Sequence, residues 1–259
     1  MDWIRFICRY FKHVITARNT KGFGVHSPFI YQFVRFVIYE KYYFYSFSSI
    51  ENIRKKLKTD RKIIDIQDFG TGNDRRETVS RIAKHSLKSE KYGRLFFRII
   101  NYYKFRQILE LGTSLGITTS YLASSSNLIN CVSLEGSSEI ANVALENFKA
   151  LGLNNIQVAV GNIDNTLNEV LNEINELDFV FFDANHQSNA VLNYIEKCLS
   201  KAHQNSIFVI DDIHWSNDME LAWEIIKKNP AVTSTIDLFQ LGIVFFNKDL
   251  YKKHYKMRF

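Results

Sequence analysis

The sequence has few prolines and cysteines and no long hydrophobic run. Only 2 of 259 residues are proline, which excludes a proline-rich linker or a collagen-like segment and favours regular secondary structure nearly throughout. No stretch of about 18 or more uninterrupted apolar residues occurs, so we expect no membrane-spanning helix. The first residues carry charges inside their only apolar run and lack a small-residue cleavage site. A secretory signal is therefore not expected.

The three cysteines are odd in number and far apart in the chain. Cys8, Cys131 and Cys198 show no C-x-x-C spacing, which argues against a disulfide framework and against a zinc ribbon. Reduced, buried thiols are typical of cytosolic proteins. A cytoplasmic location is therefore the expectation.

The chain is rich in apolar side chains and carries a moderate positive charge. Hydrophobic residues make up 46% of the chain and charged residues 23%, a composition that excludes disorder as the overall state. The net charge of +6 permits contact with nucleic acid or with an anionic membrane surface. It also suits an ordinary basic enzyme, and we favour that interpretation.

From about residue 105 to residue 246 the sequence alternates short apolar runs with longer amphipathic stretches. The runs expected to form strands are 107–111, 130–134, 156–160, 177–182 and 206–210, and the stretches expected to form helices are 118–126, 138–151, 163–172 and 188–200. Such alternation predicts a parallel sheet with helices on both faces. After a helix over 217–228 come two further strands, 232–237 and 241–246. The short gap between these two strands requires an antiparallel pair.

The predicted fold is therefore a doubly wound, Rossmann-like α/β sheet of seven strands with an antiparallel last strand, over residues 105–259. Residues 1–104 look helical and aromatic, and we expect them to form an N-terminal cap in which Ser27 and Pro28 begin a helix. Residues 2–17 are amphipathic and basic, and such a segment can lie on a membrane or a partner. More often it packs on its own domain.

Small or polar residues follow every parallel strand of this predicted sheet. In open α/β sheets, ligands bind at the carboxyl ends of the strands. The residues at these ends are Glu110, Gly112, Glu135, Gly161, Asn162, Asp183, Asp211 and Asp212. One of them alone could be a turn or cap residue, but five strand ends together are hard to attribute to turn chemistry. We therefore expect the ligand at this edge of the sheet.

The first strand is followed by Gly112 and Gly116. A dinucleotide fingerprint would also require glycine at the positions of Ser114 and Ile117, so an NAD- or FAD-dependent enzyme is disfavoured. A phosphate-binding P-loop is excluded too, because no Gly-Lys-Ser/Thr follows. Glu135, at the end of the second strand, can accept hydrogen bonds from both hydroxyls of a ribose. The expected ligand is a nucleoside without a pyrophosphate.

These motifs resemble the class I S-adenosylmethionine-dependent methyltransferases: E-x-G-x-x-x-G after the first strand, an acid after the second, and Asp183 after the apolar fourth strand. The likeness is closest to their small-molecule O-methyltransferase branch, of the catechol and caffeoyl-CoA type, and covers about residues 105–246. It implies S-adenosylmethionine as cofactor and an oxygen of a small molecule as methyl acceptor. The cofactor-binding residues that it implies are Glu110, Gly112, Thr113, Ser114, Gly116, Thr118, Glu135, Asn162, Ile163 and Asp183.

The same resemblance implies candidates for metal binding and catalysis. Metal-dependent members of the family bind a divalent cation through an Asp after the fourth strand and an Asp-Asn pair after the fifth. Here the corresponding residues are Asp183, Asp211 and Asp212, and their oxygen atoms suit Mg²⁺ or Ca²⁺. Alternatively, Asp183 alone contacts the amine of the cofactor, while Asp211 or Asp212 caps the next turn. The catalytic candidates are Asp183, His186, which stands where the family usually has its basic Lys, and His214.

Two functions of other classes stay open. The isoelectric point near 9.1 and the basic, aromatic N-terminus favour an RNA methyltransferase acting on tRNA, although no recognisable RNA-binding module is present. A non-catalytic cofactor-binding domain whose cap mediates assembly, including a homo-oligomer, is the other alternative. The glycine-rich segment 68–72 lacks an apolar strand after it, and we interpret it as a loop over the cofactor or acceptor.

Overall fold

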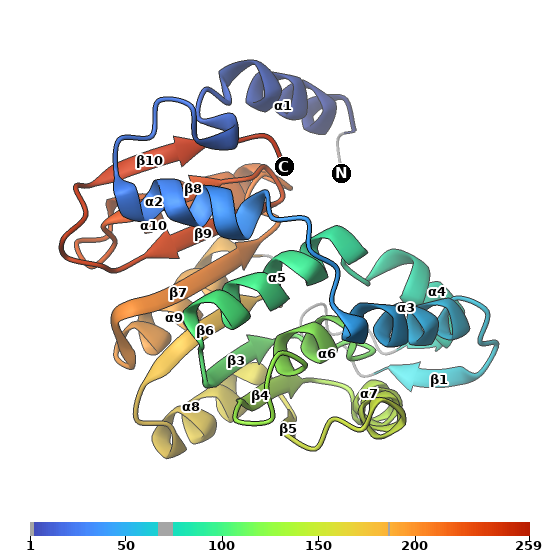
Figure 1. The fold of residues 1–259 in the computed structure, drawn as a ribbon. Helices are drawn as coiled ribbons and strands as arrows, with labels where there is room; N and C mark the ends of the chain where they lie inside the picture. Colours follow the sequence, from blue (N-terminus) through green and yellow to red (C-terminus); the bar gives the residue numbers. More distant parts are fainter. Residues whose placement is uncertain (1–2, 67–74, 186) are drawn as a thin grey trace. The chain divides into compact units, whose positions relative to one another are not determined.

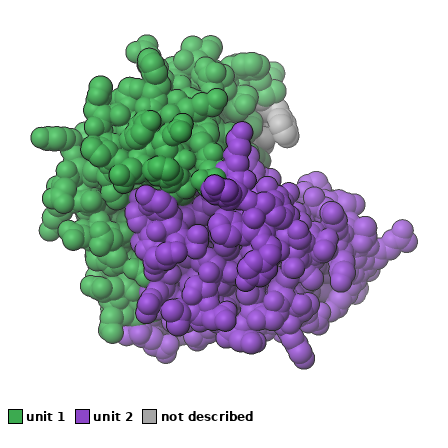
Figure 2. Space-filling view, viewed as in Figure 1, with its two compact units in different colours: residues 1–40, 174–259 green, residues 41–173 purple. Residues whose placement is uncertain are grey.

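The computed structural model describes residues 3–66, 75–185 and 187–259. The chain divides into two compact units (Figure 2), one made of residues 1–40 and 174–259 and the other of residues 41–173. The division into a cap of residues 1–104 and a cofactor domain of residues 105–259 concerns function and stays a prediction. The glycine-rich segment 68–72 lies outside the described residues.

The unit of residues 41–173 contains three parallel strands with helices around them (Figure 1). The strands are β3 (Gln107–Leu111), β4 (Asn130–Glu135) and β5 (Ile156–Val160), paired in that order. The helices are α3 (Tyr45–Leu57), α4 (Val79–His85), α5 (Glu90–Tyr103), α6 (Ile117–Ala123), α7 (Ser138–Leu151) and α8 (Ile163–Glu173). A separate antiparallel pair consists of β1 (Ile63–Ile66) and β2 (Arg75–Thr78).

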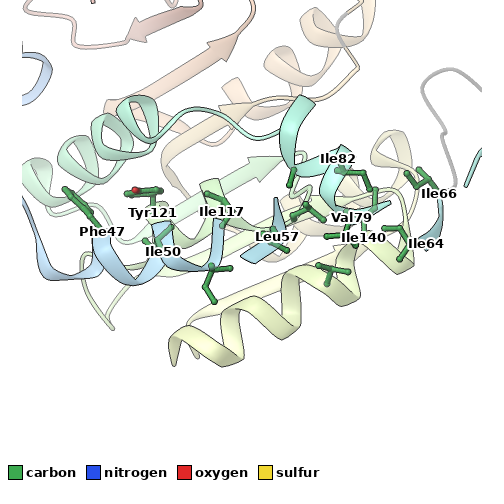
Figure 3. Close-up of a cluster of buried hydrophobic side chains, with 14 of the residues drawn as sticks. Phe47, Ile50, Leu57, Ile64, Ile66, Val79, Ile82, Ile117, Tyr121 and Ile140 are labelled. Atoms are coloured by element: carbon green, nitrogen blue, oxygen red, sulfur yellow. The ribbon is translucent and has the colours of Figure 1, made fainter. Parts of the chain in front are cut away.

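Buried side chains from α3, α4, α6, α7 and strand β1 form one hydrophobic cluster in this unit (Figure 3). Phe47 of α3 and Tyr121 of α6 are both fully buried, with ring centroids 5.4 Å apart. The Tyr121 hydroxyl donates a hydrogen bond to Glu51 at 2.9 Å, and Glu51 in turn pairs with Arg54 at 2.9 Å. Because the polar tip is satisfied, the ring can be buried without an unpaired hydroxyl. This packing holds α6, and so the turn before it, in place.

The unit formed by the two ends of the chain contains five strands in the order β10-β8-β9-β7-β6. They are β6 (Leu177–Phe182), β7 (Ala202–Asp211), β8 (Ser234–Asp237), β9 (Leu241–Phe245) and β10 (Lys253–Lys256). The helices are α1 (Trp3–Thr16), α2 (Pro28–Phe33), α9 (Ser188–Leu199) and α10 (Asn217–Lys228), with short helical turns η1 (Thr20–Gly22) and η2 (Val34–Ile38). Strand β9 runs antiparallel to both β7 and β8.

The predicted α/β class is confirmed, but the sheet has eight strands instead of seven. The strand missing from the prediction is β10, which pairs parallel to β8 at the end of the strand order. Its sequence, KHYK, has only one buried residue in four. Charged side chains are typical of edge strands, where they discourage pairing with other chains. Ser27 caps α2 as expected, with its hydroxyl accepting the Ile30 N–H at 3.4 Å.

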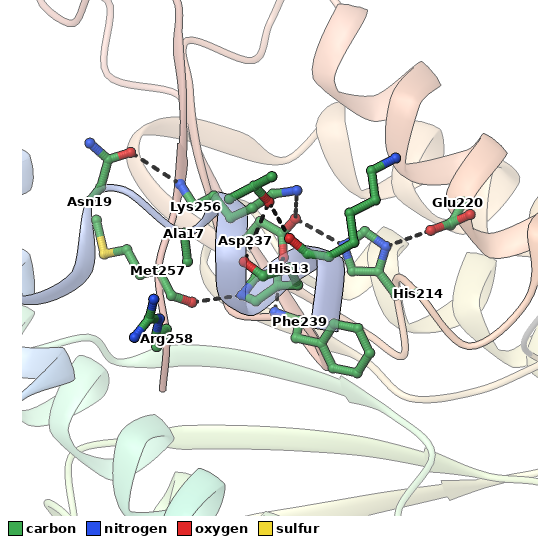
Figure 4. A network of polar contacts seen from close by, with 12 residues as sticks. His13, Ala17, Asn19, His214, Glu220, Asp237, Phe239, Lys256, Met257 and Arg258 are labelled. Carbon is green, nitrogen blue, oxygen red and sulfur yellow. Dashed lines mark hydrogen bonds and ion pairs between the residues drawn. The ribbon is translucent and has the colours of Figure 1, made fainter. Parts of the chain in front are cut away.

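Helix α1 is fixed to its own unit by a buried cluster of histidine and carboxylate side chains (Figure 4). Asp237, at the end of β8, lies between His13 of α1 and His214 of the segment after β7. The His13 Nδ1 atom is 3.3 Å from one carboxylate oxygen, and the His214 Nε2 atom is 2.9 Å from the other. Burial raises the pKa of Asp237, but the two neighbouring histidines outweigh burial and lower it.

None of the helices that the structure describes has the length and apolar character needed to span a bilayer.

Candidate functional site

A tight turn joins β3 to α6. The N–H groups of Gly112 and Thr113 both donate to the carbonyl oxygen of Leu134, at 3.0 and 3.1 Å, which ties this turn to the end of β4. Gly116, directly before α6, has a φ of 77°. A Cβ atom added at Gly116 would lie 2.6 Å from the buried Phe148 ring of α7. Glycine is therefore required here both by backbone conformation and by space.

Glu135, at the end of β4, connects this turn to its neighbours. One carboxylate oxygen accepts the Ser114 N–H at 2.8 Å, and the other accepts the Ser137 N–H at 3.0 Å. The backbone carbonyl of Glu135 accepts the Gly161 N–H, after β5, at 2.9 Å. Burial raises the pKa of Glu135, whereas the backbone N–H groups favour its charged form. Each carboxylate oxygen has a second lone pair, so the side chain can still accept hydroxyl groups.

Glu110 of β3 is fully buried beneath the same turn. Its Oε2 atom accepts hydrogen bonds from the hydroxyls of Thr119, at 2.5 Å, and Ser133, at 2.7 Å. Its Oε1 atom is buried and accepts no hydrogen bond from the described residues. Burial, together with the nearby charge of Glu135, raises the pKa of Glu110 to about 8. The site thus contains a buried carboxyl group with one oxygen available to a hydrogen-bond donor.

The other predicted cofactor residues of this unit lie at or just after the same strand ends. Asn162 begins α8, where its side-chain oxygen accepts the Asp164 N–H at 3.0 Å, so the predicted adenine contact is also a helix cap. Ile163 is half-buried at the start of α8, and Thr118 is buried in the first turn of α6. Backbone hydrogen bonds therefore tie together the turns that carry the nine predicted residues from Glu110 to Ile163.

The predicted metal ligands belong to the other unit. Asp183 follows β6 and is half-buried, Asp211 ends β7 and is buried, and Asp212 has a φ of 51°. Asp183 and Asp212 directly follow their strands, whereas Asp211 is the last residue of β7. Their carboxylates do not form a group with all ligand atoms within 4.8 Å; among the described residues, only His13, His214 and Asp237 do so. The metal site stays a prediction.

The two histidine candidates differ in what the structure says of them. His186 lies outside the described residues. His214 has a carboxylate at each ring nitrogen, with Glu220 2.9 Å from Nδ1 and Asp237 2.9 Å from Nε2. Burial lowers the pKa of His214, but the two carboxylates outweigh burial and raise it. In this arrangement both nitrogens donate to carboxylates, which does not favour a role in accepting protons; the catalytic assignment of His214 stays a prediction.

Sequence reasoning missed the residues that support Glu110. Ser133 lies inside an apolar strand and its hydroxyl is 2.6 Å from that of Thr113 as well as bonded to Glu110. The serine within the apolar run Cys-Val-Ser-Leu could have identified Ser133 as a residue of the site, because a buried hydroxyl needs a hydrogen-bond partner. Asn147 of α7, which donates to the Leu115 carbonyl at 2.9 Å, gives no comparable signal in the sequence.

Residues 109–213 match a family model described as a methyltransferase domain. Three similar solved structures are cofactor-bound Rv0187 from MTB, the O-methyltransferase from Bacillus cereus in complex with SAH, and the O-methyltransferase TomG from Streptomyces achromogenes in complex with SAM. Their identities to this chain are 21%, 21% and 15%, with TM-scores of 0.56, 0.57 and 0.56. The matches cover 64%, 83% and 84% of this chain and 84%, 96% and 94% of the respective structures. A search of the curated proteins found no match.

The matched segment contains the turn after β3 and the strand ends of β4 and β5, where the predicted cofactor residues gather. The similar structures, at these identities, support the fold. The family model supports the domain itself. The prediction of a methyltransferase domain is thereby confirmed for residues 109–213.

Proposed function

We propose that this chain transfers a methyl group from S-adenosylmethionine to an oxygen atom of a small-molecule acceptor. Support comes from similar structures described as O-methyltransferases, two of them in complex with SAH or SAM. The observation that carries the proposal is the pair of carboxyl groups, Glu110 and Glu135, at the glycine turn between β3 and α6. Hydrogen-bond acceptors of this kind suit a ligand rich in donors, such as an aminoacyl nucleoside.

The residues present fit this cofactor. Glu110 has a buried carboxyl oxygen that receives no hydrogen bond from the described residues, and the positive charge of the methionine moiety's ammonium group would stabilise its charged form. Glu135 is anchored by two backbone N–H groups, so it is already oriented to accept the ribose hydroxyls. The positive φ angles of Gly112 and Gly116 let the backbone approach a ligand closely. Asn162 and Ile163 border the adenine.

Methyl transfer from a sulfonium needs alignment more than a covalent nucleophile. The bound cofactor supplies an electrophilic methyl group, and the acceptor oxygen forms the new C–O bond as the C–S bond breaks. Good alignment can contribute up to about 7–11 kcal/mol. The acceptor hydroxyl must also lose its proton, for which we propose His186 as base. Asp183, Asp211 and Asp212 are proposed to hold Mg²⁺ or Ca²⁺, which would lower the pKa of that hydroxyl.

Replacing Glu135 by glutamine is expected to weaken the binding of S-adenosylmethionine. The substitution keeps the shape of the side chain but removes its charge and replaces one acceptor with a donor. Loss of hydrogen bonds to a charged group costs about 1.5–3 kcal/mol, or roughly a 10- to 150-fold rise in Kd. Isothermal titration calorimetry measures this directly. The matched control is Glu146→Gln, an exposed residue of α7 in the same unit; equal Kd values for both variants would remove Glu135 from the cofactor site.

The methyl acceptor class is tested by incubating the enzyme with isotopically labelled S-adenosylmethionine and a panel of catechols and other hydroxylated small molecules. Labelled methyl ethers and S-adenosylhomocysteine are the expected products. A chelator should suppress turnover, and Mg²⁺ should restore it, if the three aspartates hold a cation. Turnover that a chelator never changes would remove the metal from the proposal. Methylation of tRNA in place of the small molecules would overturn the proposed acceptor class.

A further inference from the structure

Helix α1 is amphipathic, and the side of it that packs on its own unit is already defined. The Phe6 ring lies 5.7 Å from the Trp215 ring and 5.2 Å from the Phe239 ring. Arg9 pairs with Glu220 at 3.2 Å, and His13 is 3% exposed beside Asp237. These contacts fix the rotation of the helix about its axis. The opposite side of α1 therefore faces away from the unit's own core.

That opposite side carries a row of large apolar residues. Ile4, Ile7, Phe11 and Ile15 are 75%, 46%, 59% and 76% exposed. Their spacing of three and four positions places them on one stripe of the helix. Single exposed apolar residues are ordinary on a protein surface, but a continuous stripe marks a surface that binds something. Here the stripe cannot be covered by the core of its own unit, because the inner side of the helix already occupies that core.

The charge around the stripe has one sign. Helix α1 contains Arg5, Arg9 and Lys12 and no acidic residue. Residues 3–39 as a whole contain six lysines and arginines and not a single Asp or Glu. Arg5 and Lys12 are exposed and lie beside the apolar stripe by their helical positions. The complementary surface is therefore apolar beneath a layer of negative charge.

A second copy of the chain and a nucleic acid fit this stripe less well. A helix of 14 residues is about 21 Å long and about 10 Å wide, so its stripe covers roughly 200 Å², against about 800 Å² per partner in a stable protein interface. No acid on α1 could pair with the cations of a second α1. Single-stranded RNA binds through aromatic stacking, which isoleucines do not provide.

We propose that α1 docks this protein on the surface of a bilayer that contains anionic phospholipid. The helix lies in the plane of the interface, with Ile4, Phe11 and Ile15 inserted at the level of the acyl chains and Arg5 and Lys12 among the headgroups. The buried cluster at Asp237 holds the helix in the orientation that presents this stripe. This proposal is independent of the proposed methyl acceptor.

The cysteines provide a direct probe of this docking. Cys8, next to the stripe, is exposed, whereas Cys131 and Cys198 are buried. An environment-sensitive fluorophore attached to Cys8 in the folded protein should shift its emission to the blue and brighten on addition of phosphatidylglycerol-containing vesicles. Vesicles of phosphatidylcholine alone should give a much weaker change. Added salt should reduce the response, because it screens the lysine and arginine charges.

Unlabelled variants show whether the stripe itself is responsible. The double substitution Phe11→Ser, Ile15→Ser should weaken binding to phosphatidylglycerol vesicles, because two large apolar side chains no longer insert. The partition coefficient, measured by sedimentation with the vesicles, should fall by more than about tenfold. Tyr251→Ser is the matched control: this side chain is 93% exposed in the same unit but lies outside α1, and its binding should equal that of the unaltered protein. Both substitutions are on the surface, and circular dichroism verifies that the variants are folded.

Three results would overturn the proposal. The first is absence of binding to phosphatidylglycerol vesicles at low salt by folded protein. The second is a concentration-dependent dimer, seen by sedimentation velocity, that the Phe11→Ser, Ile15→Ser variant abolishes, because the stripe would then be a self-association surface. The third is salt-dependent binding to tRNA that the same variant abolishes, which would assign the stripe to nucleic acid.

Discussion

Replacing Gly116 by alanine is expected to destabilise the protein by about 2–5 kcal/mol and to abolish cofactor binding. The new Cβ atom would lie 2.6 Å from Phe148 and 3.0 Å from the Ala144 Cβ atom, and both neighbours are buried in α7. Neither can move without disturbing the core, and overpacking of this kind costs about 1–3 kcal/mol. The φ of 77° adds about 1–2 kcal/mol of backbone strain for any side chain. Urea denaturation and calorimetry with S-adenosylmethionine measure the two effects.

The chain offers a control that separates strain from lack of space. Gly152, after α7, has a similar φ of 68°, but a Cβ atom added there would meet nothing within 4 Å. Gly152→Ala should therefore cost only about 1–2 kcal/mol, the conformational part of the effect. Adding Phe148→Leu to Gly116→Ala should recover part of the lost stability, since it removes the atoms that clash. Equal losses in Gly116→Ala and Gly152→Ala would show that the turn has room for a side chain.

Replacing Asp237 by alanine is expected to cost about 3–5 kcal/mol and to loosen α1. The substitution leaves His13 and His214 buried without their shared carboxylate, and removing one partner of a buried ion pair typically costs this much. It also removes the acceptor of the Phe239 N–H, which is bonded to Asp237 at 2.9 Å. The loss of stability is measured by urea denaturation. Loosening of α1 should appear as faster trypsin cleavage at Lys12 and Arg18, which lie at its end.

Asp178→Ala is the matched control for this substitution. Asp178 also pairs with a histidine, His203, at 3.0 Å in the same unit, but the two side chains are 24% and 23% exposed. A pair that water can reach contributes about 0–1 kcal/mol. We therefore expect trypsin to cleave α1 in Asp178→Ala no faster than in the unaltered protein. Comparable destabilisation by both substitutions would mean that the cluster at Asp237 does not hold the helix.

The packing of α1 on its own unit should also depend on pH, in a direction set by the two groups whose pKa values are shifted, His214 and Asp237. The pKa of His214 is raised from 6.5, so its contribution to stability is present in full below that value and is lost as the pH rises through the raised pKa. The pKa of Asp237 is lowered from 3.8, so its contribution is present above that value and is lost as the pH falls through the lowered pKa. Protection of α1 from a protease with a broad pH range should fall on the alkaline side. Asp237→Ala should weaken that dependence, because only Glu220 then remains beside His214.

The sequence was sufficient to predict the elements whose apolar residues recur at a regular spacing and whose ends are marked by helix-stopping or turn residues. Helices α7 and α10 begin and end at the predicted residues, because apolar residues recur at helical spacing and a Gly or an Asn-Pro pair stops each helix. The turn after β3 was predicted by its glycines. The β1–β2 pair and β10 were not, since a strand of four residues is too short to show a periodic signal.

The contacts that define the site were less accessible from the sequence. That Glu135 binds the backbone of Ser114, 21 positions away, depends on how two turns meet at the strand ends. That His13 contacts the carbonyl of Met257, 244 positions away, depends on the whole path of the chain. A single sequence contains residue types and spacing, and neither indicates which distant side chains fold against each other. The prediction of His214 as a catalytic base therefore took no account of its two carboxylate neighbours, Glu220 and Asp237.

The division of the chain has a consequence for its synthesis. Residues 41–173 form one compact unit from one continuous segment, whereas the other unit combines residues 1–40 with residues 174–259. Helices α1 and α2 are therefore synthesised long before the strands of residues 174–259 with which they share a unit. During that interval the apolar residues of α1 and α2 that pack in this unit have no native partner, so nascent chains should depend on chaperones until residues 174–259 have been synthesised.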